Sequence, residues 1–398
     1  MGYGAAGVFA QIFLAQQRRD LQHDQQMGAV CSRPPLDTNG DIGGTSDGPG
    51  DSAPFVEELQ LASALETHLG AFWKSENQDD YFVCEREFGG RRGHALFCVF
   101  DGHGTNGKKV AGIARNKLPQ ALLSAIDEQI KSNADSRSGE SGDAAAADAK
   151  DTSAAPATSS ETGDVAGKAD SLSGVNFELA LVSAFLVVQS TLKDSRLDCS
   201  CSGATASVAY FVGNDLYVAN VGDSRVVLGQ ALGSKTRRGR APAGKYSPMT
   251  LTRDHRLSLK DEFERCQNAG ARIQPKKIHG VFVGEKRLWL KDLEVPGLVV
   301  TRSLGDTLAA TIGCSAVPEV TRRRINANAR HHLILASDGV WDVLSNEEVV
   351  DTCSSAATPE SAVAAIRDAS LDRWEQNAMS DNITVLLVKV LGAAARDE

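Results

Sequence analysis

Two short apolar runs that each end in an aspartate constrain the fold of this chain most. Residues 96–100 are followed by Asp101-Gly102, and residues 333–337 are followed by Asp338-Gly339. Runs of this length and composition indicate buried strands. An aspartate at the end of a buried strand is held at the edge of the core, where an unpartnered carboxylate is costly and a ligating one is useful. By contrast, Asp47-Gly48 follows no strand-like run and fits an ordinary turn.

The rest of the pattern predicts antiparallel strands in clusters, with helices between the clusters. Helical periodicity over 107–131 contains Pro119, which indicates a kink or a division into two helices. Further helices are expected at 175–193, 258–269 and 359–376. Strands are expected at 80–85, 95–100, 204–212, 215–221, 224–229, 297–301, 332–336 and 383–390.

Two segments lack the composition of a folded core. Residues 1–52 are rich in small and polar residues without periodicity, and we interpret them as a disordered tail. Residues 133–171 are of low complexity and we interpret them as a disordered insert. The insert would loop out of a single folded domain that spans residues 53–394.

The bulk composition excludes several classes of protein. The chain has 398 residues, a hydrophobic fraction of 42% and a net charge of −9, so we expect a globular protein that does not bind nucleic acid. Its eight cysteines are scattered and do not form a disulfide framework. No run is long enough to span a bilayer. We expect a monomer located in the cytoplasm or the nucleus.

A short motif in the tail allows two interpretations. Three residues separate Met27-Gly28 from Ser32, which matches the N-myristoylation pattern. Cys31 would suit a second acyl chain, and stable anchoring needs two such signals. If translation starts at Met27, the protein would associate with the cytoplasmic face of a membrane. The alternative is a chance match in a disordered tail.

Further aspartates stand at strand ends. Asp79 and Asp381 each lie just before an apolar strand, Asp223 follows another, and Asp342 lies about one helical turn after Asp338. If these carboxylates converge, they repel one another unless cations lie between them. Ligands that are all oxygens favour Mg²⁺ or Mn²⁺ over zinc or copper.

At this point the chain resembles the metal-dependent type 2C serine/threonine protein phosphatases. The resemblance covers about residues 70–391 apart from the insert, and its pieces occur in the family's order. The matching segments are 76–79 (ENQD), 100–104 (FDGHG), 202–206 (SGATA), 219–225 (ANVGDSR), 251–255 (LTRDH), 301–306 (TRSLGD), 337–342 (SDGVWD) and 380–384 (SDNIT).

The resemblance implies an α+β fold, a four-layer αββα sandwich of two antiparallel sheets flanked by paired helices. It also implies two core cations and a third, weaker one. The core ligands would be Asp79, Asp101, the Gly102 carbonyl, Asp338 and Asp381, with Asp101 bridging. The third cation would be held by Asp223 and Asp342 together with Asp338.

The same resemblance implies a reaction and a substrate class. A hydroxide that bridges the two core cations would attack phosphoserine or phosphothreonine on protein substrates. His103 resembles the family's general acid, which protonates the departing alkoxide.

Two positions depart from the family's common residues. Lys74 stands where an arginine usually binds the phosphate, and it keeps the charge without the bidentate fork. Gln78 stands where a glutamate is frequent. These departures support one alternative function: a pseudophosphatase that uses the cleft to bind a phosphoprotein or a kinase.

Among the other residues, Arg225 and Arg302 are expected to pair with acidic loops, and His255 is expected at a helix start. Residues 271–296 correspond to the family's flap beside the active site.

Overall fold

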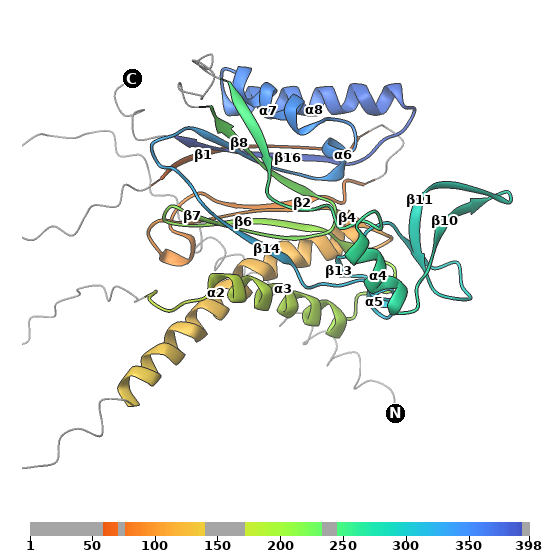
Figure 1. Cartoon of the computed structure of the whole chain (residues 1–398), viewed down its shortest axis with the longest axis horizontal. Coiled ribbons are helices and arrows are strands. Elements are labelled where there is room, and N and C mark those ends of the chain that lie inside the picture. Colours follow the sequence, from red (N-terminus) through yellow and green to blue (C-terminus); the bar gives the residue numbers. More distant parts are fainter. Residues whose placement is uncertain (1–58, 71–75, 140–171, 233–244, 392–398) are drawn as a thin grey trace, which may run out of the picture.

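A computed structural model of the chain describes residues 59–70, 76–139, 172–232 and 245–391. Two five-stranded sheets lie face to face, and a layer of helices covers the outer face of each (Figure 1). The predicted four-layer αββα sandwich is therefore confirmed. None of the helices in the described ranges is long and apolar enough to cross a bilayer.

The first sheet has the strand order β1-β16-β15-β8-β9, and neighbouring strands are antiparallel. Its strands are β1 (Gln60–His68), β16 (Ile383–Leu391), β15 (His331–Ala336), β8 (Arg225–Ala231) and β9 (Tyr246–Thr250).

The second sheet has the order β14-β7-β6-β3-β2 and is also antiparallel. Its strands are β14 (Glu319–Arg324), β7 (Asp215–Val221), β6 (Ala206–Val212), β3 (His94–Phe100) and β2 (Asp80–Cys84).

Helices α2 (Gly107–Gly139) and α3 (Phe177–Asp194) cover the second sheet, and α7 (Asn346–Ser355) and α8 (Pro359–Gln376) cover the first (Figure 1). Three shorter helices lie near one end of the sandwich, and they are α4 (Lys260–Asn268), α5 (Thr307–Ala310) and α6 (Asp338–Trp341). The single turn η1 (Phe88–Gly90) lies in the connection between β2 and β3, at the opposite end of these two strands.

The apolar runs divide their side chains between two cores, because successive residues of a strand face opposite sides. In β3, Phe97 packs between the sheets, whereas Leu96 and Cys98 pack under α2 and α3. In β16, Leu386 faces the other sheet and Leu387 faces α7 and α8. Central strands are thus buried on both faces, which is why their sequences show no polar alternation.

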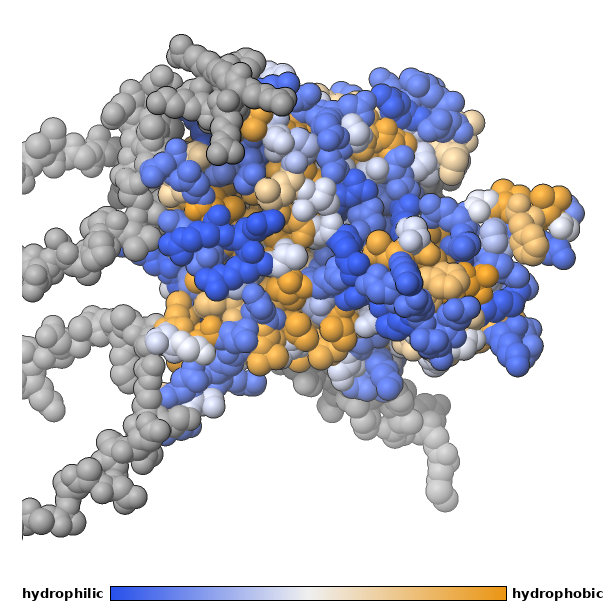
Figure 2. All heavy atoms as spheres, viewed as in Figure 1, coloured by the Kyte–Doolittle hydropathy of each residue, from blue (hydrophilic) through white to orange (hydrophobic). Residues whose placement is uncertain are grey.

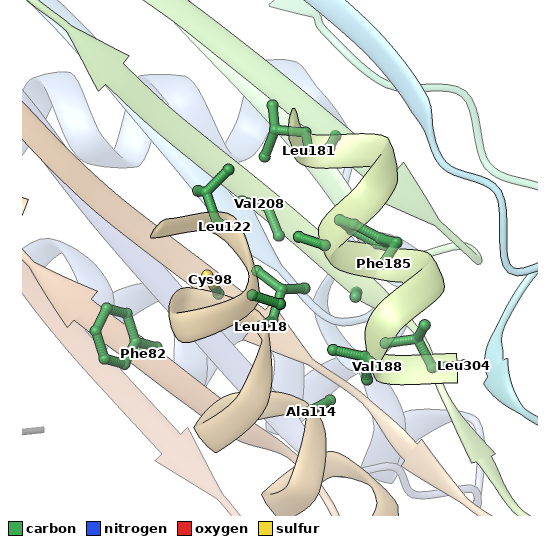
Figure 3. Close-up of a cluster of buried hydrophobic side chains, with 14 of the residues drawn as sticks. Phe82, Cys98, Ala114, Leu118, Leu122, Leu181, Phe185, Val188, Val208 and Leu304 are labelled. Atoms are coloured by element: carbon green, nitrogen blue, oxygen red, sulfur yellow. The ribbon is translucent and has the colours of Figure 1, made fainter. Parts of the chain in front are cut away.

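The core beneath the second sheet is close-packed. Leu118 and Leu122 of α2 and Phe185 and Val188 of α3 meet Val208 of the sheet (Figure 3). This packing holds the two helices against the strands whose ends carry the aspartates.

A hairpin projects from the sandwich beside the aspartate-bearing end (Figure 1). It consists of β10 (Arg272–Ile278) and β11 (Val281–Trp289), and β12 (Pro296–Leu298) completes a three-stranded sheet. We call residues 271–296 the flap, as in the expectation above. Its tip carries exposed Val281 and Phe282, which form an apolar end on a mostly polar face (Figure 2). A small sheet of β13 (Leu304–Gly305), β5 (Gly203–Ala204) and β4 (Gly102–His103) lies next to the aspartates.

Three expectations need correction. Helix α2 continues through Pro119 without division and ends at Gly139, because buried Leu118, Pro119 and Leu122 anchor it. Residues 133–139, assigned to the insert, therefore belong to this helix, and 140–171 lie outside the described residues. Six of the described cysteines are free thiols, as the absence of a disulfide framework predicts, but Cys84 is in a disulfide.

Candidate active site

The strand-end aspartates meet at one end of the sandwich. Asp79 comes just before β2 and Asp101 just after β3, and these antiparallel strands place Asp80 opposite Phe100. The first sheet repeats the arrangement, because Ala336 of β15 lies opposite Val385 of β16, near Asp338 and Asp381. A cleft of about 630 Å³ opens at this point. Its lining includes Asp101, His103, Asp223, Asp338, Asp342 and Asp381.

Asp79 lies beneath the cleft and joins the two sheets. Only 3% of the residue is exposed, and its Oδ2 accepts a hydrogen bond of 2.9 Å from Ser337 Oγ. Its Oδ1 is buried and has no hydrogen-bond partner. An unpartnered buried carboxylate oxygen is costly, so this atom requires a cation or a proton.

Asp101 occupies the centre of the acidic cluster. It interacts electrostatically with Asp338, Asp79 and Asp381. Burial, and then the charges of Asp338, Asp79 and Asp381, raise its pKa well above the usual range. Burial and the charge of Asp381 likewise raise the pKa of Asp79 to about 6.

The pKa of Asp338 is also raised well above its ordinary value, by burial and then by the charges of Asp223 and Asp381. Carboxylates that repel one another in this way can be ionised together only beside positive charge. The cluster therefore favours cation binding.

Two glycines allow the backbone to approach closely around the cluster. A Cβ on Gly102 would lie 2.5 Å from the Gly107 carbonyl oxygen and 2.6 Å from that of Gln78. A Cβ on Gly339 would lie 1.9 Å from the Asn382 carbonyl oxygen. Asn382 also accepts a hydrogen bond of 3.0 Å from the Gln78 backbone N–H. The Asp-Gly pairs after β3 and β15 are thus packing requirements as well as turns.

His103 forms an ion pair that the sequence did not indicate. Its Nε2 lies 2.6 Å from Oδ2 of Asp306, which is 1% exposed. Ser303 Oγ donates to the same oxygen at 2.6 Å. Burial alone would lower the pKa of His103, but the Asp306 carboxylate outweighs burial and raises it above the usual value. The imidazole is therefore held in its proton-donating form.

Asp223 and Asp342 lie on the outer side of the cluster with Arg256, another residue that the sequence did not single out. Arg256 Nε lies 2.8 Å from Asp223 Oδ2, and Nη2 lies 2.8 Å from Asp342 Oδ1. The signal that could have found it is its position directly after the 251–255 segment. His255 is buried and its Nδ1 accepts a hydrogen bond from Gly222 N–H, so it supports the Asp223 loop and does not cap a helix.

Two arginines pair with acidic residues, as expected. Arg225 pairs with Asp254, with Nη2 2.6 Å from Oδ2, and Arg302 pairs with the fully buried Glu262 at 2.8 Å. Asp254 lies in a loop, as expected, whereas Glu262 lies in the first turn of α4, so the partner of Arg302 is a helical residue.

Three predicted functional residues, Lys74, Gly28 and Cys31, lie outside the described residues.

The donor set fits Mg²⁺ or Mn²⁺ by its chemistry, since it consists of carboxylates and one backbone carbonyl. Among the described residues, however, no three His, Cys, Asp or Glu side chains already converge as a finished metal site. Arg256 holds two of the carboxylates, and the others are arranged around hydrogen bonds. Bound cations would have to draw them together.

Comparisons with known proteins show the family to which the chain belongs. The family described as Protein phosphatase 2C matches residues 155–379. The chain is 31% identical over 348 residues to "Probable protein phosphatase 2C 72" of Arabidopsis thaliana, covering 85% of this chain and 91% of that protein. It is 36% identical over 304 residues to "Probable protein phosphatase 2C 12" of Oryza sativa subsp. japonica, covering 76% and 74%.

A solved structure shares the fold. The serine-threonine phosphatase 2C from Toxoplasma gondii superposes with a TM-score of 0.62 at 21% identity, and the match covers 86% of this chain and 97% of that one. The matched segments, the fold and the acidic cleft agree, and the chain belongs to the protein phosphatase 2C family of serine/threonine phosphatases.

Proposed function

We propose that this chain hydrolyses phosphoserine and phosphothreonine on proteins with the help of divalent cations. The observation that carries the proposal is the acidic cluster at the cleft, where burial and the charges of neighbouring aspartates raise the pKa values of Asp79, Asp101 and Asp338. Such a cluster has no structural benefit without cations, because each added charge increases the repulsion.

The core ions, Mn²⁺ or Mg²⁺, would be held by Asp79, Asp101, the Gly102 carbonyl, Asp338 and Asp381. A third would be held by Asp223 and Asp342 with Asp338. When bound, such cations acidify water into a nucleophile and neutralise phosphoryl oxygens.

The chain's own residues supply the proton for the leaving group. His103 lines the cleft, and its Nε2 is engaged by Asp306, which leaves Nδ1 to act on a substrate. The Asp306 carboxylate raises the pKa of His103 and so favours the protonated ring. Donating that proton to the serine or threonine oxygen as the P–O bond breaks avoids releasing a free alkoxide.

The test is turnover of a phosphothreonine peptide with Mn²⁺, with Mg²⁺ and with EDTA. We expect wild-type turnover that requires a metal ion and falls at least about a hundredfold in Asp338→Asn. Asp372→Asn is the control, because this residue is exposed on α8 away from the cleft, and it should retain full activity.

The alternative is the pseudophosphatase function. A folded wild-type protein with no turnover under any metal would support that alternative, with Gln78→Glu as the next variant.

A further inference from the structure

Arg256 is the cationic side chain at the centre of the outer acidic group. Its Nε binds Asp223, and its Nη2 contacts both oxygens of Asp342 at 2.8 and 3.0 Å. Nη2 also lies 3.7 Å from Asp338 Oδ2. One guanidinium thus reaches all three carboxylates proposed above for the third cation.

The surroundings hold this guanidinium in place. Arg256 is bridged to Val300 in antiparallel fashion, and its backbone N–H donates to the Asp254 carbonyl at 2.8 Å. Its side chain is 17% exposed, and that of Asp223 is 5% exposed. At the outer end, Nη1 lies 3.4 Å from Glu285 Oε1 on β11 of the flap.

The guanidinium and a divalent cation would draw on the same carboxylates. A small cation such as Mg²⁺ or Mn²⁺ needs carboxylate oxygens at close to 2 Å in a near-octahedral arrangement, whereas Arg256 already uses one oxygen of Asp223 and both of Asp342. The two positive charges would also repel each other at this range. Binding of one therefore weakens binding of the other.

We propose that Arg256 is a built-in counter-ion that competes with the third divalent cation for Asp223 and Asp342 and so keeps that cation weakly bound. The inference rests on the proposed function, because it concerns the outer cation of the same site. Arg256 acts through the carboxylates and is a positioning residue.

Arg225 provides a matched control within the same protein. Its side chain is 19% exposed, close to the 17% of Arg256, and its guanidinium also binds an aspartate by two bonds, to Asp254. Asp254 is not among the carboxylates proposed as ligands. Replacing Arg225 therefore removes an equally buried arginine without freeing a cation ligand.

The experiment is a Mn²⁺ titration in which free Mn²⁺ is counted by its electron paramagnetic resonance signal. The proteins are wild type, Arg256→Met, Arg256→Lys and Arg225→Met, each checked for folding by circular dichroism. We expect Arg256→Met to bind the weakest Mn²⁺ about tenfold to a hundredfold more tightly than wild type, since charge-assisted contacts to its ligands are removed. Arg256→Lys should lie in between, because it keeps the charge and loses the fork.

The affinity gain should depend on the shared carboxylate. Adding Asp342→Asn to Arg256→Met should abolish the tightened ion, and Arg225→Met should bind Mn²⁺ as wild type does. The proposal would be overturned if Arg256→Met bound its weakest Mn²⁺ with the affinity of wild type, or if it bound no third Mn²⁺ ion. A gain of equal size in Arg225→Met would overturn it too, because a general charge effect would then suffice.

Binding of the two core ions and peptide turnover test the proposed function independently of the Arg256 proposal. If two tight ions and metal-dependent turnover are present while Arg256→Met shows no gain, the counter-ion role fails and the phosphatase stands. If no Mn²⁺ binds and no turnover occurs in any of these proteins, both proposals fail.

Discussion

At the scale of single residues, Asp306 shows how a functional side chain can escape sequence analysis. Its backbone is left-handed, with φ 41° and ψ 47°, which is uncommon for a residue other than glycine. This conformation brings the carboxylate into contact with His103. Gly203 provides the space for it, because a Cβ on Gly203 would lie 2.1 Å from Asp306 Oδ2. The small residues of the 202–206 segment therefore serve the His103–Asp306 pair.

This pair leads to a prediction about leaving groups. In Asp306→Asn the negative charge that keeps His103 protonated is lost, so turnover of a phosphothreonine peptide should fall by roughly tenfold to a thousandfold. Turnover of p-nitrophenyl phosphate should fall much less, because its phenolate leaves without a proton. The measurement is the ratio of kcat values for the two substrates.

The control for Asp306→Asn is Ser303→Ala, which removes a hydrogen bond to the same carboxylate but leaves its charge and its contact with His103. It should change the ratio little. An equal loss on both substrates in Asp306→Asn would show that Asp306 supports the fold and not proton transfer.

At the scale of elements, the strands that sequence analysis missed are largely edge strands. β1 and β9 lie at the two edges of the first sheet, and β14 lies at one edge of the second. Edge strands are partly open to solvent, so they lack the continuous apolar runs of β3 and β16; β14 even carries four exposed residues of six. The flap strands β10 and β11 were missed because few of their residues are buried, although β11 is the central strand of its sheet.

Helix α7, which sequence analysis also missed, begins with a capping box that can be tested. Ser345 Oγ accepts from the Glu348 N–H at 3.2 Å, and the Glu348 carboxylate accepts from the Ser345 N–H at 2.8 Å. We expect Ser345→Ala to lower the free energy of unfolding by about 1 kcal/mol, measured by urea denaturation.

The same helix offers the control for Ser345→Ala. Ser355 Oγ donates to the Asp351 carbonyl at the helix's last turn, where no backbone N–H depends on it, so Ser355→Ala should be close to neutral. Equal losses in both variants would contradict the capping role.

At the scale of the whole molecule, two buried histidines make stability depend on pH. Burial lowers the pKa of His94 and of His332 to about 4; they are 2% and 6% exposed. Because an unfolded histidine titrates near 6.5, the unfolded chain binds more protons between these values. Stability is therefore fully present above about pH 6.5 and is lost as the pH falls toward 4.

The expected loss is on the order of 2–3 kcal/mol for each histidine. The measurement is urea denaturation of the EDTA-treated protein from pH 7 to pH 4, for wild type and for His94→Asn with His332→Phe. The free energy of unfolding of the double variant should fall less between pH 7 and pH 4 than that of wild type. The acidic cluster, whose raised pKa values act in the opposite direction, is present in both proteins and cancels in the comparison. Identical slopes would show that these histidines do not titrate differently on folding.

The sequence by itself determined the layered antiparallel fold, the family and the set of aspartates at strand ends, because buried runs and Asp-Gly turns are local signals. Tertiary structure decided which residues those aspartates contact. Asp79 and Asp101 are brought to Asp338 across two sheets, Asp306 comes under His103, and Arg256 reaches Asp223 and Asp342. These contacts join residues far apart in the chain, and the burial that raises their pKa values exists only after the sheets have packed.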